Sequence, residues 1–286
     1  MQLRAEAPAR AGHKHQGGKH KLRRWIIQQF PQHVTYCEPY FGAGSVFFAK
    51  PRSRIEVVND RNAGIVNFYD CLRAWPEELA QAIALTPYSR YEFIRAQLAD
   101  LRQMPTEKAD KLEMARQFFV WANQGRGRAG VSEPGGWAFA ARLSRVRTFA
   151  DDWATAPDHL LALAGRLQGV YLECGDALTV IQRWDGPTTL HYLDPPYLPA
   201  TRGDRWDDCT YLHEMSADDH EELARVVLGC AGTFVISHYT CPTYDDLYLA
   251  HGWRRVERQV TVGDQLRAEA LYISPNCRQQ PAFSFA

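Results

Sequence analysis

The sequence lacks the cysteine spacing that marks a metal site or a disulfide framework. Seven cysteines are scattered along 286 residues, and no two of them form a C-x-x-C pair. An odd, scattered set in a chain of this length is typical of reduced thiols. We therefore expect no disulfide framework and no metal site, and we expect cysteines that pack as small buried hydrophobic residues.

An excess of either charge is also missing. The 33 lysines and arginines balance the 33 aspartates and glutamates, so no overall field attracts the chain to nucleic acid, and any basic binding surface has to be local. Residues 86–149 carry a net charge of +5, whereas residues 200–250 carry −7. The basic residues of the first segment either form a surface for a polyanion or cover solvated helix faces.

A membrane span and a secretory signal are missing as well. The first 24 residues contain seven lysines and arginines and no apolar core, which is unlike a secretory signal. The longest uncharged run, 226–244, contains serine, histidine, threonine, tyrosine and proline, so we interpret it as buried core. We expect a cytoplasmic protein without a membrane partner.

The apolar pattern predicts an α/β domain that is interrupted by a helical stretch. Strand-like runs near the start alternate with helical runs, and this βαβα order favours a parallel sheet covered on both faces. The expected strands are 34–37, 55–58, 170–173, 188–193, 233–237, 255–262 and 270–274, the last two as an antiparallel hairpin. The expected helices are 22–30, one that begins at 46, 63–72, 76–85, 90–101, 107–121, 153–167, 217–228 and 244–251. We predict a discontinuous α/β domain over 17–75 and 168–280, a helical insertion over 76–167 and a flexible basic tail over 1–16.

A glycine-containing turn follows the first expected strand. Residues 38–44 read E-P-Y-F-G-A-G, and glycines between a strand and a helix let the backbone approach a ligand whose anionic group the helix N-terminus accepts. The third glycine of a dinucleotide fingerprint is missing, which disfavours NAD. The acid at the strand end, Glu38, suits a ligand with a positive centre, such as a sulfonium. A tight strand-to-helix turn without a ligand explains the glycines equally well.

Two further acids follow expected strands. Asp60 closes the second strand, where a carboxylate accepts hydrogen bonds from ribose hydroxyls in doubly wound nucleotide sites. Asp176 has the same place after the third strand. Each acid can instead cap the helix that follows it, and Asp60 can do both.

The sequence D-P-P-Y at 194–197 follows the strand expected over 188–193. Two successive prolines cannot donate ladder hydrogen bonds, and they stiffen the turn. They hold Asp194, the Pro195 carbonyl and the Tyr197 ring at the carboxyl edge of the sheet, where open α/β sheets bind ligands. The two acceptors suit an exocyclic amine on a base that stacks on the ring, and they stabilise a nitrogen that becomes positive in the transition state. The alternative is a stiffened turn without a ligand.

Together, these motifs resemble those of the D12 class of N6-adenine-specific DNA methyltransferases, in particular its phage and prophage members. Gly17-Gly18-Lys19 resembles the family's N-terminal motif, 38–44 its E-P-F-x-G-x-G motif, 59–62 its ribose-binding acid and 194–197 its D-P-P-Y. The resemblance covers nearly the whole chain, in the motif order of the family's α arrangement. The departures are Tyr40 in place of the more usual phenylalanine, and His15-Gln16 where members often carry an aromatic residue.

The resemblance implies a Rossmann-like, S-adenosylmethionine-dependent methyltransferase sheet with the helical insertion as target-recognition domain. It implies that the S-adenosyl-L-methionine-binding residues are Lys19, Glu38, Pro39, Phe41, Gly42, Gly44, Asp60 and Asp176, and that the catalytic residues are Asp194, Pro195, Pro196 and Tyr197. An adenine of double-stranded DNA would be flipped out of the duplex and methylated directly, without a metal. The loop after 121 suggests Asn123, Arg126 and Arg128 as DNA contacts. We expect a monomer.

Other functions fit parts of the same pattern. Amino methylation of RNA stays open, because a flipped base looks the same in both nucleic acids. Cytosine-N4 enzymes of this type usually have serine in place of Asp194, which favours adenine. A catalytically silent DNA-binding module would have no physical need for Asp194 and Tyr197 together with the glycines. The insertion does not match GATC-methylating members closely enough to transfer a recognition sequence.

Overall fold

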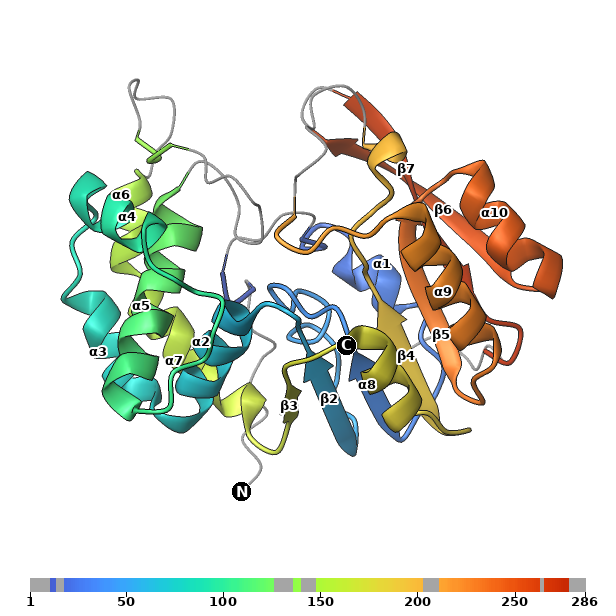
Figure 1. Cartoon of the computed structure of the whole chain (residues 1–286), viewed down its shortest axis with the longest axis horizontal. Helices are drawn as coiled ribbons and strands as arrows, with labels where there is room; N and C mark the ends of the chain where they lie inside the picture. Colours follow the sequence, from blue (N-terminus) through green and yellow to red (C-terminus); the bar gives the residue numbers. More distant parts are fainter. Residues whose placement is uncertain are drawn as a thin grey trace.

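The computed structural model describes residues 11–13, 18–125, 136–139, 148–202, 211–262 and 265–277. Arg126 and Arg128, predicted to contact DNA, and almost all of the predicted tail over 1–16 lie outside these ranges. The described part contains a seven-stranded sheet with helices on both faces and a further group of helices beyond one edge (Figure 1). The predicted Rossmann-like α/β class is therefore confirmed.

The sheet is parallel over most of its width. Its order is β3-β2-β1-β4-β5-β7-β6, in which β1 to β5 pair in parallel and β7 is antiparallel to both β5 and β6. The bounds are β1 Thr35–Glu38, β2 Ile55–Asn59, β3 Tyr171–Glu173, β4 Thr189–Leu193, β5 Thr233–Tyr239, β6 Arg254–Val262 and β7 Gln265–Ile273. The hairpin predicted for the last two strands is confirmed, and its second strand, β7, lies between β5 and the edge strand β6.

Side chains that alternate along the strands build two separate cores. On β4, Tyr192 belongs to a larger hydrophobic cluster and Leu193 to a smaller one, and Leu271 and Tyr272 on β7 are divided in the same way. Successive side chains of a strand point to opposite faces, so each cluster lies on its own face of the sheet. All five β4 residues are buried, as expected for a parallel strand covered on both sides.

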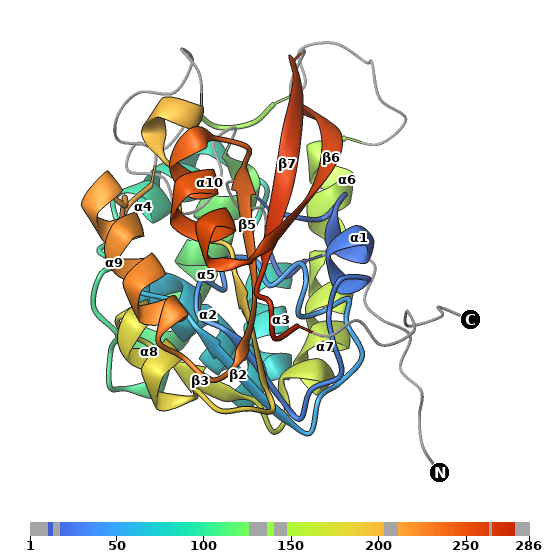
Figure 2. The same cartoon turned by 90° about the vertical axis from the view of Figure 1, so that its right-hand side faces the viewer.

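The smaller core is covered by three helices that follow β3, β4 and β5. These are α8 Ala177–Arg183, α9 Ala217–Leu228 and α10 Pro242–Tyr248, with the short 3₁₀ helices Pro199–Thr201 and Leu249–His251 beside them. Figure 2 shows α8, α9 and α10 on one side of the sheet and α1, Arg23–Ile27, on the other. A capping box starts α9: the Ser216 side chain accepts from the Asp219 N–H, and the Asp219 carboxylate accepts from the Ser216 N–H.

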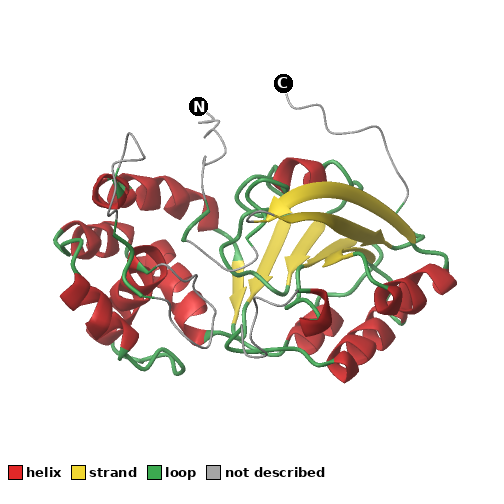
Figure 3. Ribbon diagram, turned by 90° about the horizontal axis from the view of Figure 1, so that it is seen from above, coloured by secondary structure: helices red, strands yellow, loops and turns green. Residues whose placement is uncertain are grey.

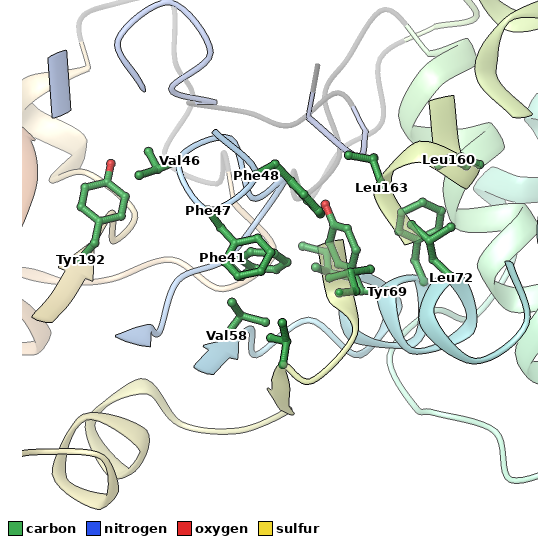
Figure 4. Close-up of a cluster of buried hydrophobic side chains, with 14 of the residues drawn as sticks. Phe41, Val46, Phe47, Phe48, Val58, Tyr69, Leu72, Leu160, Leu163 and Tyr192 are labelled. Atoms are coloured by element: carbon green, nitrogen blue, oxygen red, sulfur yellow. The ribbon is translucent and has the colours of Figure 1, made fainter. Parts of the chain in front are cut away.

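A group of helices lies beside the β3 edge of the sheet (Figure 3). It consists of α2 Ala63–Ala74, α3 Pro76–Ala84, α4 Arg90–Gln97, α5 Lys108–Gln124, α6 Phe149–Ala154 and α7 Ala156–Leu167. Leu72 of α2 and Leu163 of α7 belong to the same cluster as Phe41 and Tyr192 next to the sheet (Figure 4). The helical group and the sheet therefore share one hydrophobic core.

The helix predicted to begin at Val46 is not a regular helix. Phe48 donates its N–H to the Gly44 carbonyl and Lys50 to the Val46 carbonyl, but the segment over 45–50 forms a series of turns. The next residue is Pro51, which has no N–H to continue the series. The prediction is wrong because the proline comes before a stable helix length is reached.

Two other helical predictions also differ from the structure. The helix predicted over 153–167 is two helices, α6 and α7, because Pro157 starts a new helix just after Thr155. Helix α8 was not predicted, since its sequence ALTVIQR contains three β-branched residues that favour strands. Asp176 caps it by accepting the Thr179 N–H.

Candidate active site

A cavity of about 660 Å³ lies at the carboxyl ends of β1, β2 and β4. Chain connections leave β1 and β4 toward opposite sides at this edge, which is where open α/β sheets bind ligands. Every residue predicted to be catalytic or to bind the cofactor lines this cavity: Lys19, Glu38, Pro39, Phe41, Gly42, Gly44, Asp60, Asp176, Asp194, Pro195, Pro196 and Tyr197. Residues from five separate segments of the sequence are thus brought together.

The glycine turn after β1 is held in a left-handed conformation. Gly42 and Gly44 have φ angles of 49° and 66°, which side chains with a Cβ adopt only with strain. A Cβ at Gly44 would lie 2.6 Å from the Phe41 ring and 2.8 Å from the Phe48 ring. The ring of Phe41 packs edge-on against Tyr69 in the core, with ring centroids 4.8 Å apart. The turn therefore offers its backbone to the cavity.

The carboxylate of Asp60 holds this turn against the end of β2. Its Oδ2 accepts the Gly42 N–H at 2.8 Å and its Oδ1 accepts the Asn62 N–H at 2.9 Å. Asp60 does not cap α2, because Asn62 accepts the N–H groups of Gly64 and Ile65 there. Burial raises the pKa of Asp60 to about 6 although these backbone bonds lower it. The Arg61 N–H also bonds this carboxylate, and because a carboxylate accepts about four hydrogen bonds, about one position is left for a hydroxyl.

Asn59 joins the loops that follow three neighbouring strands. Its Nδ2 donates to the Pro39 carbonyl at 2.9 Å and to the Gly175 carbonyl at 3.1 Å, and its Oδ1 accepts the Gly175 N–H at 3.0 Å. The asparagine is buried and lines the cavity. Its positioning role was not predicted, although it lies next to Asp60 in the sequence.

Glu38 is a buried acid at the end of β1. Its Oε2 accepts the Tyr36 hydroxyl at 2.7 Å. Burial raises the pKa of Glu38 to about 8, the Tyr36 bond lowers it, and the charge of Asp194 raises it further. An acid in this state is stabilised in its ionised form by a positive ligand. The site therefore suits a ligand with a cationic group near Glu38.

Lys19, Asp194, Tyr197 and Glu269 form a buried cluster at the end of β4. Lys19 Nζ is 2.7 Å from Asp194 Oδ1 and 3.6 Å from Glu269 Oε1, and it lies 4.7 Å from the centroid of the Tyr197 ring. The Tyr197 hydroxyl donates to Glu269 Oε1. Burial lowers the pKa of Lys19, but the two carboxylates outweigh it and the pKa is raised. Lys19 is therefore held as an ammonium.

The backbone of the D-P-P-Y turn is fixed by two side chains that were not predicted. His238 Nε2 accepts the Leu198 N–H at 3.0 Å, and burial lowers the pKa of His238 to about 3, so it is a neutral acceptor. Arg202 donates to the Tyr197 carbonyl and pairs with both carboxylate oxygens of Glu214, at 2.8 and 2.6 Å. These bonds set where the Tyr197 ring can lie.

Of the predicted DNA contacts, the structure describes only Asn123, which does not line the cavity. Asn123 is half-buried on α5, where its Nδ2 donates to the Phe119 carbonyl at 2.9 Å. Arg126 and Arg128 lie outside the described residues. Their role in DNA binding stays a prediction.

The described part of the chain contains free cysteines, and it contains neither a metal-binding cluster nor a helix able to span a membrane. Within these ranges, no three His, Cys, Asp or Glu side chains gather as a metal site would require. The six cysteines within the same ranges are free: Cys37, Cys71, Cys174, Cys230, Cys241 and Cys277. Of the helices described, none combines the length and the apolarity needed to pass through a bilayer.

Comparison with known proteins identifies relatives that align with most of this chain. A family model described as D12 class N6 adenine-specific DNA methyltransferase matches residues 15–262. A DNA N-6-adenine-methyltransferase of Escherichia phage P1 is 25% identical over 249 residues, which are 83% of this chain and 31% of that protein, so the chain spans about a third of its length. The type II methyltransferase M1.LlaDCHI of Lactococcus lactis subsp. cremoris is 25% identical over 259 residues, 86% of this chain and 87% of that protein.

A solved structure shows a more distant likeness. The precorrin 8w decarboxylase of Methanobacterium thermoautotrophicum aligns with 91% of this chain and 93% of its own, at 10% identity and a TM-score of 0.37. A likeness at this level carries no conclusion about function.

Proposed function

The chain belongs to the family of D12 class N6 adenine-specific DNA methyltransferases, and from this premise we propose that it transfers a methyl group from S-adenosyl-L-methionine to N6 of an adenine in double-stranded DNA. The observation that carries the proposal is the single cavity that joins the D-P-P-Y turn to Lys19, Glu38, the glycine turn and Asp60. Side by side, these groups supply an acid that can bind a cation, an acceptor for a hydroxyl and two acceptors for an amine.

The residues of the cavity fit S-adenosyl-L-methionine. Glu38 is a buried acid placed to stabilise a positive centre, and Asp60 has acceptor capacity for a ribose hydroxyl at the end of β2. The methionine end would lie near the glycine turn and Lys19, and the adenine near Asp176. When bound, this co-substrate supplies a methyl group on a sulfonium sulfur. The cavity volume of about 660 Å³ is in the usual range of small-molecule sites.

Asp194, the Pro195 carbonyl and Tyr197 would bind the target base. Because the amine of an adenine is inaccessible inside a duplex, the base is flipped out and stacks on the Tyr197 ring. The two acceptors then favour a nitrogen that becomes positive in the transition state. The new N–C bond forms as the C–S bond breaks, the sulfur keeps that electron pair, and the nitrogen loses one proton to the Asp194 carboxylate. Pro196 keeps the turn rigid.

The helical region would be the part that reads DNA. We assign the discontinuous catalytic domain to 17–75 and 168–280 and the target-recognition domain to 76–167. Asn123, Arg126 and Arg128 remain the proposed contacts in this domain. A monomer is sufficient, because one recognition domain can read an asymmetric site or each half of a palindrome in successive events. Methylation of RNA or of cytosine N4 are the alternatives that the experiment has to separate.

Incubation with unmethylated genomic DNA and S-adenosyl-L-methionine tests the proposal directly. Nucleoside mass spectrometry should detect N6-methyladenine, and methylation-sensitive sequencing should place it in a short motif. Asp194→Ala should abolish transfer while DNA binding is retained. The exposed Asp218, on α9 and outside the cavity, supplies the control Asp218→Ala, which should leave transfer unchanged. The assignment would be contradicted if N4-methylcytosine were the only methylated base, or if RNA but not DNA were methylated.

A further inference from the structure

The ammonium group of Lys19 contacts both groups that would bind the target base, the Asp194 carboxylate and the Tyr197 ring. Its Nζ lies 2.7 Å from Asp194 Oδ1 and over the ring of Tyr197, 4.7 Å from the centroid. In the proposed reaction, the same carboxylate accepts an N–H of the base and the same ring stacks on it. Lys19 and the target adenine therefore compete for one place.

Lys19 needs another anionic partner if it is to leave Asp194. The side chain is only 6% exposed, and a buried ammonium without a partner is strongly unfavourable. Glu269 Oε1 is 3.6 Å from the same Nζ. A shift of roughly 0.8 Å would bring this pair to ordinary hydrogen-bond length, so Glu269 is within reach.

Glu269 also contacts the ring on which the base would stack. It lies on β7 opposite Tyr239 of β5, is almost fully buried, and accepts the hydroxyl of Tyr197. The D-P-P-Y turn follows β4, whereas β7 pairs with β5. The order of the strands in the sheet, and not closeness in the sequence, therefore brings the acid to this turn. One carboxylate thus touches both groups that a docked base would disturb.

We propose that Glu269 is a positioning residue that receives the Lys19 ammonium when a target adenine binds Asp194. The inference rests on the proposed function and assigns Lys19 two alternative ion-pair partners during the reaction. Lys19 pairs with Asp194 before the base docks and with Glu269 once it is docked. The second position releases the Asp194 carboxylate for the amine while the lysine charge stays neutralised.

Glu269→Gln isolates the charge of this residue. The glutamine carbonyl still accepts the Tyr197 hydroxyl, but it no longer attracts the ammonium. At saturating S-adenosyl-L-methionine we expect kcat for DNA methylation to fall about tenfold. The Kd for DNA should change less than about twofold, because phosphate contacts dominate affinity. Glu269→Asp restores a carboxylate and should recover part of kcat.

The deciding measurement repeats Glu269→Gln in a Lys19→Met background. The competing ammonium is then gone, so the second substitution should change kcat less than about twofold. A purely structural role of Glu269 would lower kcat by the same factor in both backgrounds, and that result would overturn the proposal. Glu257→Gln on the neighbouring strand β6, exposed and outside the cavity, is the matched control and should leave kcat unchanged.

Failure of the proposed function has a different signature. Wild-type protein that transfers no methyl group to DNA would refute that function and the lysine movement with it. Wild-type transfer with equal effects of Glu269→Gln in both backgrounds would refute the lysine movement alone.

Discussion

The hydroxyl of Tyr36 donates a 2.7 Å hydrogen bond to Oε2 of Glu38, two residues further along the same strand. Residues i and i+2 of a strand point to the same face, so the tyrosine lies directly behind the acid. Both side chains are buried. Burial raises the pKa of Glu38 to about 8 even though this bond lowers it. Without a cationic partner, the acid at the ligand end of β1 is thus largely protonated at neutral pH.

This state predicts a pH-dependent preference for a cationic ligand. Below pH 8, Glu38 has to lose its proton before it can pair with a sulfonium, so binding is weakened; above pH 8 the carboxylate is already ionised. The affinity ratio of S-adenosyl-L-methionine to its neutral-sulfur product S-adenosylhomocysteine should therefore rise roughly tenfold between pH 6.5 and 8.5. Isothermal titration calorimetry at both pH values measures the ratio.

Glu38→Gln is the control for this pH effect. It should remove the pH dependence of the ratio and leave S-adenosylhomocysteine as the better ligand at both values. A ratio in the wild type that stays constant across this range would show that Glu38 does not face the sulfonium.

The sequence predicts the strand ends better than the segments between them. Runs of apolar residues mark the buried strands, and the acids Glu38, Asp60 and Asp194 that follow them are placed by parallel pairing at one edge of the sheet. The helix expected after Gly44 is wrong, because local periodicity does not weigh Pro51 against a run of only six residues. Features set by one proline or one cap are the least predictable from periodicity.

Gly44→Ala should destabilise the protein by more than its backbone conformation requires. The φ angle of 66° alone costs an alanine roughly 1–2 kcal/mol, and the new Cβ would overlap the rings of Phe41 and Phe48. We expect a loss of about 3 kcal/mol in the free energy of unfolding. Gly252→Ala is the matched control, because Gly252 has a φ of 78° but no atom within 4 Å of the added Cβ. Equal losses in urea unfolding would contradict the packing argument.

Glu56→Gln should weaken the attachment of α7, the last helix of the helical group, to the sheet. Glu56 on β2 pairs with Lys50 at 2.6 Å and with Arg166 of α7 at 2.7 Å. The neutral side chain would leave the buried Lys50 and the partly buried Arg166 without their counter-ion, which costs about 3–5 kcal/mol. Denaturant unfolding measures this loss.

The control for this ion cluster is an exposed pair of the same chemistry. Lys108 and Glu78 are 2.9 Å apart with both side chains about half exposed, so Glu78→Gln should leave the free energy of unfolding nearly unchanged. A loss for Glu56→Gln as small as that of the control would show that the cluster contributes little to joining α7 and β2.

Glu269 shows what a sequence pattern cannot locate. It immediately precedes the strand predicted over 270–274 and lies within β7, where its alternation with Leu271 and Ile273 places an acid on a buried face. That acid is a recognisable signal, but its partner is not. The sheet order inserts β7 beside β5, and this long-range pairing alone brings Glu269 to Lys19 and Tyr197.

Asn59→Ala should weaken cofactor binding and stability together. The side chain makes three hydrogen bonds to the loops at Pro39 and Gly175, which line the cavity on either side of it. Its loss leaves buried backbone groups without partners, so we expect about 1–3 kcal/mol less stability and roughly tenfold weaker binding of S-adenosylhomocysteine.

Asn276→Ala separates the two effects. Asn276 also joins a loop to the sheet, donating to the Gly232 carbonyl at 2.7 Å, but it lies outside the cavity. Its removal should lower stability by about 1 kcal/mol without changing the affinity for S-adenosylhomocysteine. If both variants weaken binding in proportion to their loss of stability, Asn59 acts only through the fold. Weaker binding in Asn59→Ala alone would mean that the asparagine sets the spacing of the loops that hold the nucleoside.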